Sequence, residues 1–68
     1  MSTQKRTMET VEDMIALKLE VAGCWRRASE RWLAVMGEEY ITDGQREWLL
    51  LRRRYCIAKI IGYGRVNS

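Results

Sequence analysis

The chain has 68 residues, of which 47% are hydrophobic and 31% charged, and its net charge is +3. A chain of this length forms one small domain whose core is marginal without oligomerisation, and the hydrophobic content excludes a disordered chain. Because the sequence has no histidine and its two cysteines, Cys24 and Cys56, lack a metal-ligand spacing, we expect no metal site, no cofactor and no enzymatic activity.

The first helix is expected to follow a flexible tail, residues 1–9, and to begin near Thr10, whose hydroxyl can cap the free amides. Gly23 should end it. A helical wheel places apolar residues on one face, namely Val11, Ile15, Leu19 and Ala22. Acidic residues lie on the opposite face, namely Glu12, Asp13 and Glu20. The pattern therefore predicts a helix with an acidic outer surface.

The second helix is predicted from Cys24 to Met36, and it carries the clearest apolar stripe of the chain: Trp25, Ala28, Trp32, Val35 and Met36. Trp25 and Trp32 are expected in the core. Gly37 is expected to close this helix in the left-handed conformation. The outer face is basic and carries Arg26, Arg27 and Arg31. Small and aromatic residues at these spacings favour an antiparallel hairpin of the first two helices.

The third helix is expected to open at Thr42, where Gln45 three places later completes a capping box, and to stop at Gly62, leaving residues 63–68 as a tail. Apolar residues occur nearly all round it, which indicates contacts on more than one side. The apolar surplus predicts a self-association or partner interface at Leu50, Ile57 and Ile61. We therefore predict an all-α, three-helix domain over residues 10–62, in which a helical hairpin packs on a longer third helix and two copies form a dimer.

Three consecutive arginines, Arg52 to Arg54, leave the third helix in three directions, because each residue turns the chain by about 100°. A phosphate-binding surface would therefore have to combine residues of the second and third helices. The candidates are Arg26, Arg27, Arg31, Gln45, Arg46, Arg52, Arg53 and Lys59. In a helix-turn-helix reading Gln45 and Arg46 would contact base edges, although the linker from Gly37 to Ile41 is longer than that motif usually has.

The sequence also bears on location. No window holds the roughly 18 uncharged apolar residues that a membrane span needs. The N-terminus lacks the apolar segment of a secretion signal, so we expect a cytoplasmic protein with no membrane contact. In a reducing cytoplasm the two cysteines are expected to be small buried hydrophobic residues.

Two segments, KLEVAGCWRRASERWLAVM (residues 18–36) and REWLLLRRRYCIAKI (residues 46–60), resemble the PerC family of small bacterial and prophage transcriptional activators. Residues of the first segment that match the family pattern are Lys18, Leu19, Glu20, Gly23, Trp25, Arg26, Arg27, Ala28, Arg31, Trp32 and Leu33. Those of the second segment are Arg46, Glu47, Trp48, Arg52, Arg53, Tyr55 and Cys56. The resemblance covers roughly residues 14–60.

The resemblance implies a transcriptional regulator in an enterobacterial or phage setting, which raises expression of virulence or horizontally acquired genes. It leaves two routes open, binding to DNA and binding to another, DNA-bound regulatory protein. The alternative from a different class is a protein-interaction module, or a phage-encoded inhibitor, that binds a host protein through helical apolar surface.

Overall fold

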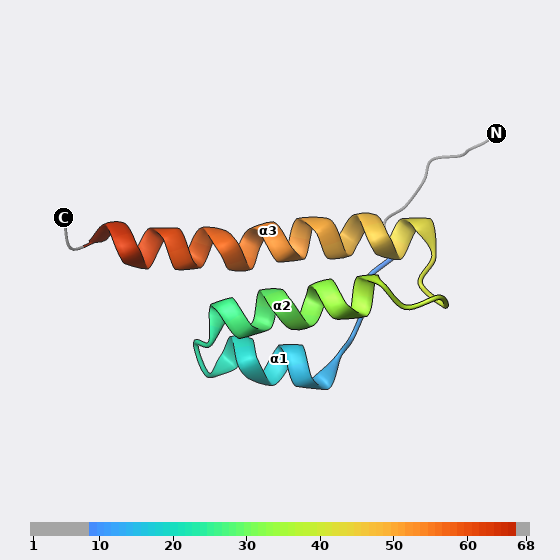
Figure 1. Ribbon diagram of the computed structural model, residues 1–68, viewed down its shortest axis with the longest axis horizontal. Coiled ribbons are helices and arrows are strands. Elements are labelled where there is room, and N and C mark those ends of the chain that lie inside the picture. The colour runs from blue at the N-terminus through green and yellow to red at the C-terminus, as the bar shows by residue number, and fades with distance from the viewer. Residues whose placement is uncertain (1–8, 67–68) are drawn as a thin grey trace.

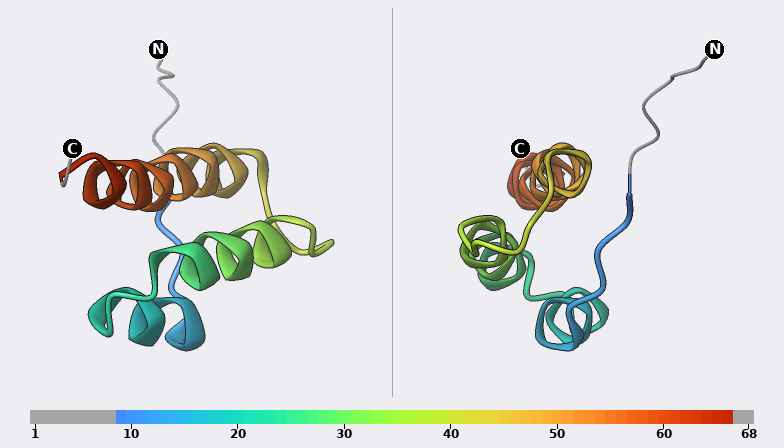
Figure 2. Two further views of the ribbon diagram at one scale, coloured as in Figure 1. Left: turned by 60° about the vertical axis from the view of Figure 1, so that its left-hand side comes forward. Right: turned by 90° about the vertical axis from the view of Figure 1, so that its right-hand side faces the viewer.

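A computed structural model of the chain describes residues 9–66, which form three helices: α1 (Met14–Val21), α2 (Trp25–Met36) and α3 (Asp43–Val66). Figure 1 shows that α1 and α2 form an antiparallel hairpin and that α2 runs antiparallel to α3. The end-on view in Figure 2 places α2 to one side of the line that joins α1 and α3. The predicted all-α fold, with a hairpin packed on a longer third helix, is confirmed.

The start of α1 differs from the prediction. Asp13, not Thr10, is the N-cap, and its carboxylate accepts a hydrogen bond from the backbone nitrogen of Ala16 at 3.0 Å. Aspartate is among the best N-caps because its side chain satisfies an amide that has no partner inside the helix. Thr10 and Val11 therefore precede α1, and the Val11 side chain packs against the core.

The turn between α1 and α2 depends on Gly23, as predicted. Its φ of 80° lies in the left-handed region that favours glycine. The nitrogen of Gly23 bonds the oxygen of Glu20 at 2.9 Å, and the nitrogen of Cys24 bonds the oxygen of Leu19 at 2.8 Å. These two bonds form a Schellman motif, which satisfies the last carbonyls of α1 and reverses the chain.

Two other glycines behave differently from the predictions. Gly37 closes α2 with a right-handed φ of −82°, because the nitrogens of Gly37 and Glu38 each bond a carbonyl three residues back, which satisfies the helix end without a left-handed residue. Gly62 lies inside α3, which continues to Val66. A glycine within a helix costs only about 1 kcal/mol relative to alanine, and no proline follows to remove a donor.

The predicted domain limits are affected only in part. Residues 63–66 of the expected C-terminal tail belong to α3, whereas residues 1–8 of the expected N-terminal tail lie outside the described residues. The limits of the folded domain, residues 10–62, stay a prediction.

The capping box at the start of α3 is confirmed. The backbone nitrogen of Gln45 donates to the Thr42 hydroxyl at 3.1 Å, and the backbone nitrogen of Thr42 donates to the Gln45 side chain at 3.0 Å. The Thr42 hydroxyl also donates to the carboxylate of Glu9 at 2.8 Å. This last bond ties the segment that precedes α1 to the start of α3.

The core lies where the three helices meet. Its buried hydrophobic residues are Ala16, Ala28, Trp32, Val35, Met36, Ile41, Leu49 and Cys56. The rings of Trp32 and Trp48 pack edge to face with centroids 5.5 Å apart, a favoured aromatic geometry. Trp32 is thus in the core as predicted, while Trp25 is partly buried against it. Both cysteines are unpaired, and Cys56 is buried while Cys24 is half-buried.

The orientation of α1 contradicts the predicted wheel. Ala16 and Glu20 face inward, whereas Ile15 and Val21 are exposed, Val21 to 89%. The prediction of an acidic outer surface fails for Glu20, which is only 8% exposed. The segment Met14–Val21 is apolar on nearly every side, so a wheel cannot select its buried face. The choice is made by the partners that Glu20 finds on α2 and α3.

Candidate nucleic-acid interface

A buried carboxylate, that of Glu20, links the three helices and fixes the direction of one basic side chain, Arg52. Glu20 of α1 accepts a hydrogen bond from the indole nitrogen of Trp32 on α2 at 2.8 Å. From α3 it accepts bonds from the Cys56 sulfur at 3.3 Å and from Arg52 Nε at 2.9 Å, and Arg52 Nη2 bonds the second carboxylate oxygen. A carboxylate is tolerated in such a site only because each oxygen is hydrogen-bonded and the charge is paired.

The network shifts the pKa values of its members. Burial opposes ionisation of Glu20, but the hydrogen bonds from Arg52, Trp32 and Cys56 outweigh it and hold the pKa of this carboxyl below 4.5. Burial, together with the hydrogen bond to Glu20, raises the pKa of the Cys56 thiol to about 12. The hydrogen bonds to Glu20 also raise the pKa of Arg52. At neutral pH the network therefore holds one carboxylate, one guanidinium and a protonated thiol.

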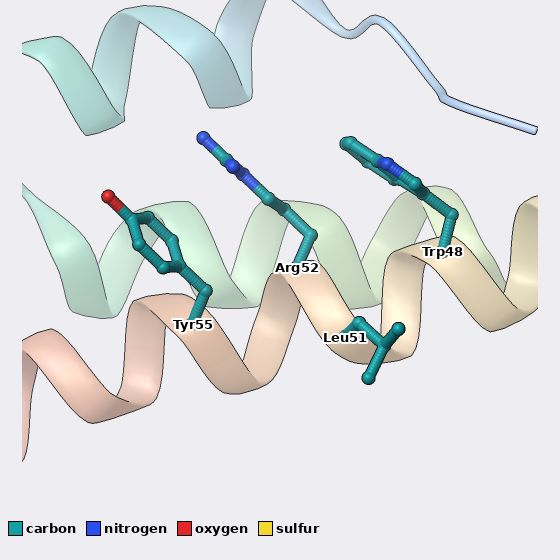
Figure 3. A pocket seen from close by; sticks show the side chains of 4 residues that line it. All are labelled: Trp48, Leu51, Arg52 and Tyr55. Atoms are coloured by element: carbon teal, nitrogen blue, oxygen red, sulfur yellow. The ribbon is translucent and has the colours of Figure 1, made fainter. Parts of the chain in front are cut away.

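Aromatic rings hold the next basic groups in place. Figure 3 shows Trp48, Arg52 and Tyr55 pointing to the same side of α3, toward α1, while Leu51 turns away. These four residues line a hollow of about 220 Å³. The Arg52 guanidinium lies 4.6 Å from the Tyr55 ring centroid, and Lys59 Nζ lies 5.3 Å from that centroid, distances at which a cation and an aromatic face attract.

Three more of the predicted phosphate-binding residues have structural partners. Arg31 makes a two-point ion pair with Asp13 at 2.8 and 2.9 Å, which lowers the pKa of the Asp13 carboxyl. Arg46 donates to the carbonyl oxygen of Met36 at the end of α2, at 3.0 Å. Gln45 is occupied by its bond to the Thr42 backbone. Arg31, which was expected on the basic outer face of the second helix, is over one third exposed and pairs with the Asp13 carboxylate at the start of α1.

The remaining candidates are Arg26 and Arg27 of α2 and Arg53 of α3, and we call these three residues the arginine patch. Arg53 Nε donates to the carbonyl oxygen of Ser29 at 3.3 Å, one helical turn from Arg26. Arg26 and Arg27 are exposed, and within residues 9–66 no acidic side chain pairs with either. They line an open hollow of about 430 Å³ together with Gly23, Cys24, Trp25 and Ile60. Arg53 therefore contacts α2 one helical turn from Arg26, and Arg26 and Arg27 line the hollow beside that turn.

The predicted apolar interface residues are partly accessible. Leu50 is 48% exposed and Ile61 52% exposed, while Ile57 is half-buried. Sequence reasoning missed a second apolar surface on α1, a hollow of about 300 Å³ lined by Met14, Leu17, Lys18, Val21 and Ala22. The available signal was the scarcity of polar residues in α1, which leaves apolar side chains outside whichever face is buried.

The described part of the chain shows no cluster of three or more potential metal ligands. In the same part, no helix combines the length and apolar character required to cross a bilayer.

No curated protein and no solved structure gives a significant match. The family model described as PerC transcriptional activator matches residues 8–64, which include all of α1 and α2 and most of α3. A match over this share of the chain shows that the protein belongs to the PerC family of transcriptional activators.

Proposed function

We propose that this protein activates transcription by binding promoter DNA, and that the arginine patch contacts the phosphate backbone. The observation that carries the proposal is the exposure of Arg26 and Arg27 without an acidic partner, beside Arg53 of the neighbouring helix. The role we propose is cytoplasmic and non-enzymatic, in a bacterial or prophage setting where the target genes are virulence or horizontally acquired genes.

The same reasoning shortens the set of candidate residues. Three of the predicted residues already have partners within the domain. Arg31 pairs with Asp13, Arg52 pairs with Glu20, and Lys59 lies over an aromatic ring. Gln45 and Arg46 close helix ends, so base reading by this pair is not part of the proposal. Guanidinium groups suit phosphate because their planar donors match two oxygens at once. A patch of three arginines would neutralise about three phosphates and give a salt slope of about −3 on a log-log plot of affinity.

A titration of a fluorescent duplex with the purified protein at low salt tests the proposal. We expect Arg26→Glu with Arg27→Glu to weaken binding at least tenfold and to flatten the salt slope, since repulsion replaces two phosphate contacts. Lys18→Glu is the matched control, because it reverses an exposed charge on α1 outside the patch. Affinity that is independent of salt, or equal losses in the patch variant and the control, would contradict direct phosphate contact by the patch.

A second candidate function is binding to another protein. That partner would be either a DNA-bound regulator, through which this protein activates transcription, or a host protein that it inhibits as a phage-encoded inhibitor. The apolar hollow on α1 favours it, because a surface helix of a monomer normally turns polar residues outward. Val21→Asp should then abolish activation of a promoter reporter while leaving the affinity for DNA unchanged. Full activation by this variant would exclude the α1 surface as the route.

A further inference from the structure

The outer side of α3 carries a regular pattern that the monomer does not use. Its residues follow one another at steps of four and three, and we call them the outer stripe: Asp43, Glu47, Leu50, Arg54, Ile57 and Ile61. Such steps keep side chains on one side of a helix, as in two-stranded coiled coils. Its members lie about 80–160° around the helix from Leu49, the buried residue that α3 packs against α2.

Charge is distributed unevenly along the outer stripe. Asp43 and Glu47 lie in its N-terminal third, and Arg54 follows in its second half. All three are exposed, and no ion pair among the side chains of residues 9–62 involves them. Among the apolar residues of the outer stripe, the two most exposed are Leu50 and Ile61, and they lie on either side of Arg54 along the helix. An antiparallel partner of the same sequence, in the register that sets its Arg54 opposite Glu47, would also bring the two Leu50 side chains to the same level.

We propose that a second copy of this chain covers the outer stripe, with the two α3 helices antiparallel about a two-fold axis. A parallel pair would place the acidic ends of both copies together, whereas the antiparallel pair matches opposite charges at both ends and opposes the helix dipoles. The exposed Leu33 of α2 lies level with Leu50 along the helices, because Arg53 bonds Ser29 and Arg46 bonds Met36 on either side of them. It extends the apolar area beside the stripe.

The size of the surface limits the affinity. A 24-residue helix is about 36 Å long, which allows an extended contact. The apolar part consists of a few half-exposed side chains, less than the roughly 800 Å² per partner of a tight interface. We therefore expect a dissociation constant of about 1–100 μM. The inference is independent of the proposed DNA contact, although the two-fold axis would give the dimer a second arginine patch.

Sedimentation velocity of the full chain without DNA, over about 1–300 μM, measures the assembly around the expected dissociation constant. We expect the wild-type protein to pass from monomer to dimer in this range. Leu50→Glu should raise the dissociation constant at least tenfold. Leu51→Glu is the matched control, because Leu51 is the next residue and equally accessible, 46% against 48% exposed, but points about 100° away from Leu50. It should raise the dissociation constant less than Leu50→Glu does.

A charge exchange tests the antiparallel orientation. Glu47→Lys and Arg54→Glu should each raise the dissociation constant about fivefold, since each places like charges opposite one another. The double variant in one chain should restore the wild-type value, because an antiparallel pair then matches opposite charges again. A monomer at every concentration overturns the proposal. So does loss of the dimer on Val21→Asp but not on Leu50→Glu, which would assign the contact to α1, or a double variant that is weaker than both single ones.

Discussion

Glu20 offers the sharpest test of how this domain is held together. The Glu20→Ala substitution removes the acceptor of four hydrogen bonds, two donated by Arg52 and one each by Trp32 and Cys56. Trp32 is fully buried, so its indole N–H would lose its hydrogen bond to Glu20 at a cost of about 1–3 kcal/mol. Arg52 is about one third exposed and can turn to water, so loss of the ion pair adds only about 1 kcal/mol.

The sum of about 2–4 kcal/mol is large for a chain of this size, whose total stability is expected at about 3–10 kcal/mol. The corresponding fall in the melting temperature is about 10–30 °C. Thermal and urea unfolding followed by circular dichroism at neutral pH would measure both quantities. Glu20→Gln should lose about half as much, because its amide oxygen can still accept from Trp32 although the charge is gone.

The matched control is Glu12→Ala, which removes an exposed glutamate just before α1 and should change the stability by less than about 0.5 kcal/mol. A Glu20→Ala variant as stable as the Glu12→Ala variant would refute the reasoning, since the buried network would then contribute nothing.

The remaining predictions concern acid, thiols and glycines. Folding lowers the pKa of Glu20 from 4.5, so the stabilisation that its carboxylate provides should be complete above pH 4.5 and decline as the pH drops through the lower folded value. The difference between the urea midpoints at pH 7 and pH 3 should therefore be smaller in Glu20→Gln than in the wild-type protein. The buried Cys56 thiol, with its pKa raised to about 12, should resist iodoacetamide at pH 8 in the native state, whereas half-buried Cys24 reacts; mass spectrometry that finds Cys56 modified as fast as Cys24 would contradict this. Gly23→Ala should cost about 1–2 kcal/mol because of its positive φ. Gly62→Ala, in open space near the C-terminal end of α3, should stabilise by about 0.5–1 kcal/mol, and reversed signs in urea unfolding would show that the assigned backbone conformations are wrong.

Local sequence signals predicted much of the fold correctly. The stripe of α2, the end of α1 at Gly23 and the Thr42 capping box each depend on residues within a few positions of one another, and all are present in the structure. The errors occurred where local signals were weak. Gly62 was predicted to end α3, although glycine permits a helix to end without requiring it.

The candidate site was predictable only as a set of residues. The wheel showed that Arg52, Arg53 and Arg54 leave α3 in different directions, and the structure gives each of the first two a different neighbour, Glu20 for Arg52 and Ser29 for Arg53. The sequence did not show which arginines lack acidic partners. That depends on the ion pairs of Glu20 with Arg52 and of Asp13 with Arg31, which the α1 sequence alone does not reveal.

By itself, the sequence determined that the chain is helical, where its hairpin turns, and which family it resembles, because capping, glycine conformation and apolar spacing act over one or two helical turns. Only the tertiary structure decided that Glu20 points inward and that Val21 points outward. The physical reason is that a segment apolar on all sides gains similar burial in several orientations, so the pairing of one carboxylate with an arginine, an indole and a thiol from other helices selects among them. That selection also leaves Arg26 and Arg27 as basic groups without acidic partners in the described chain.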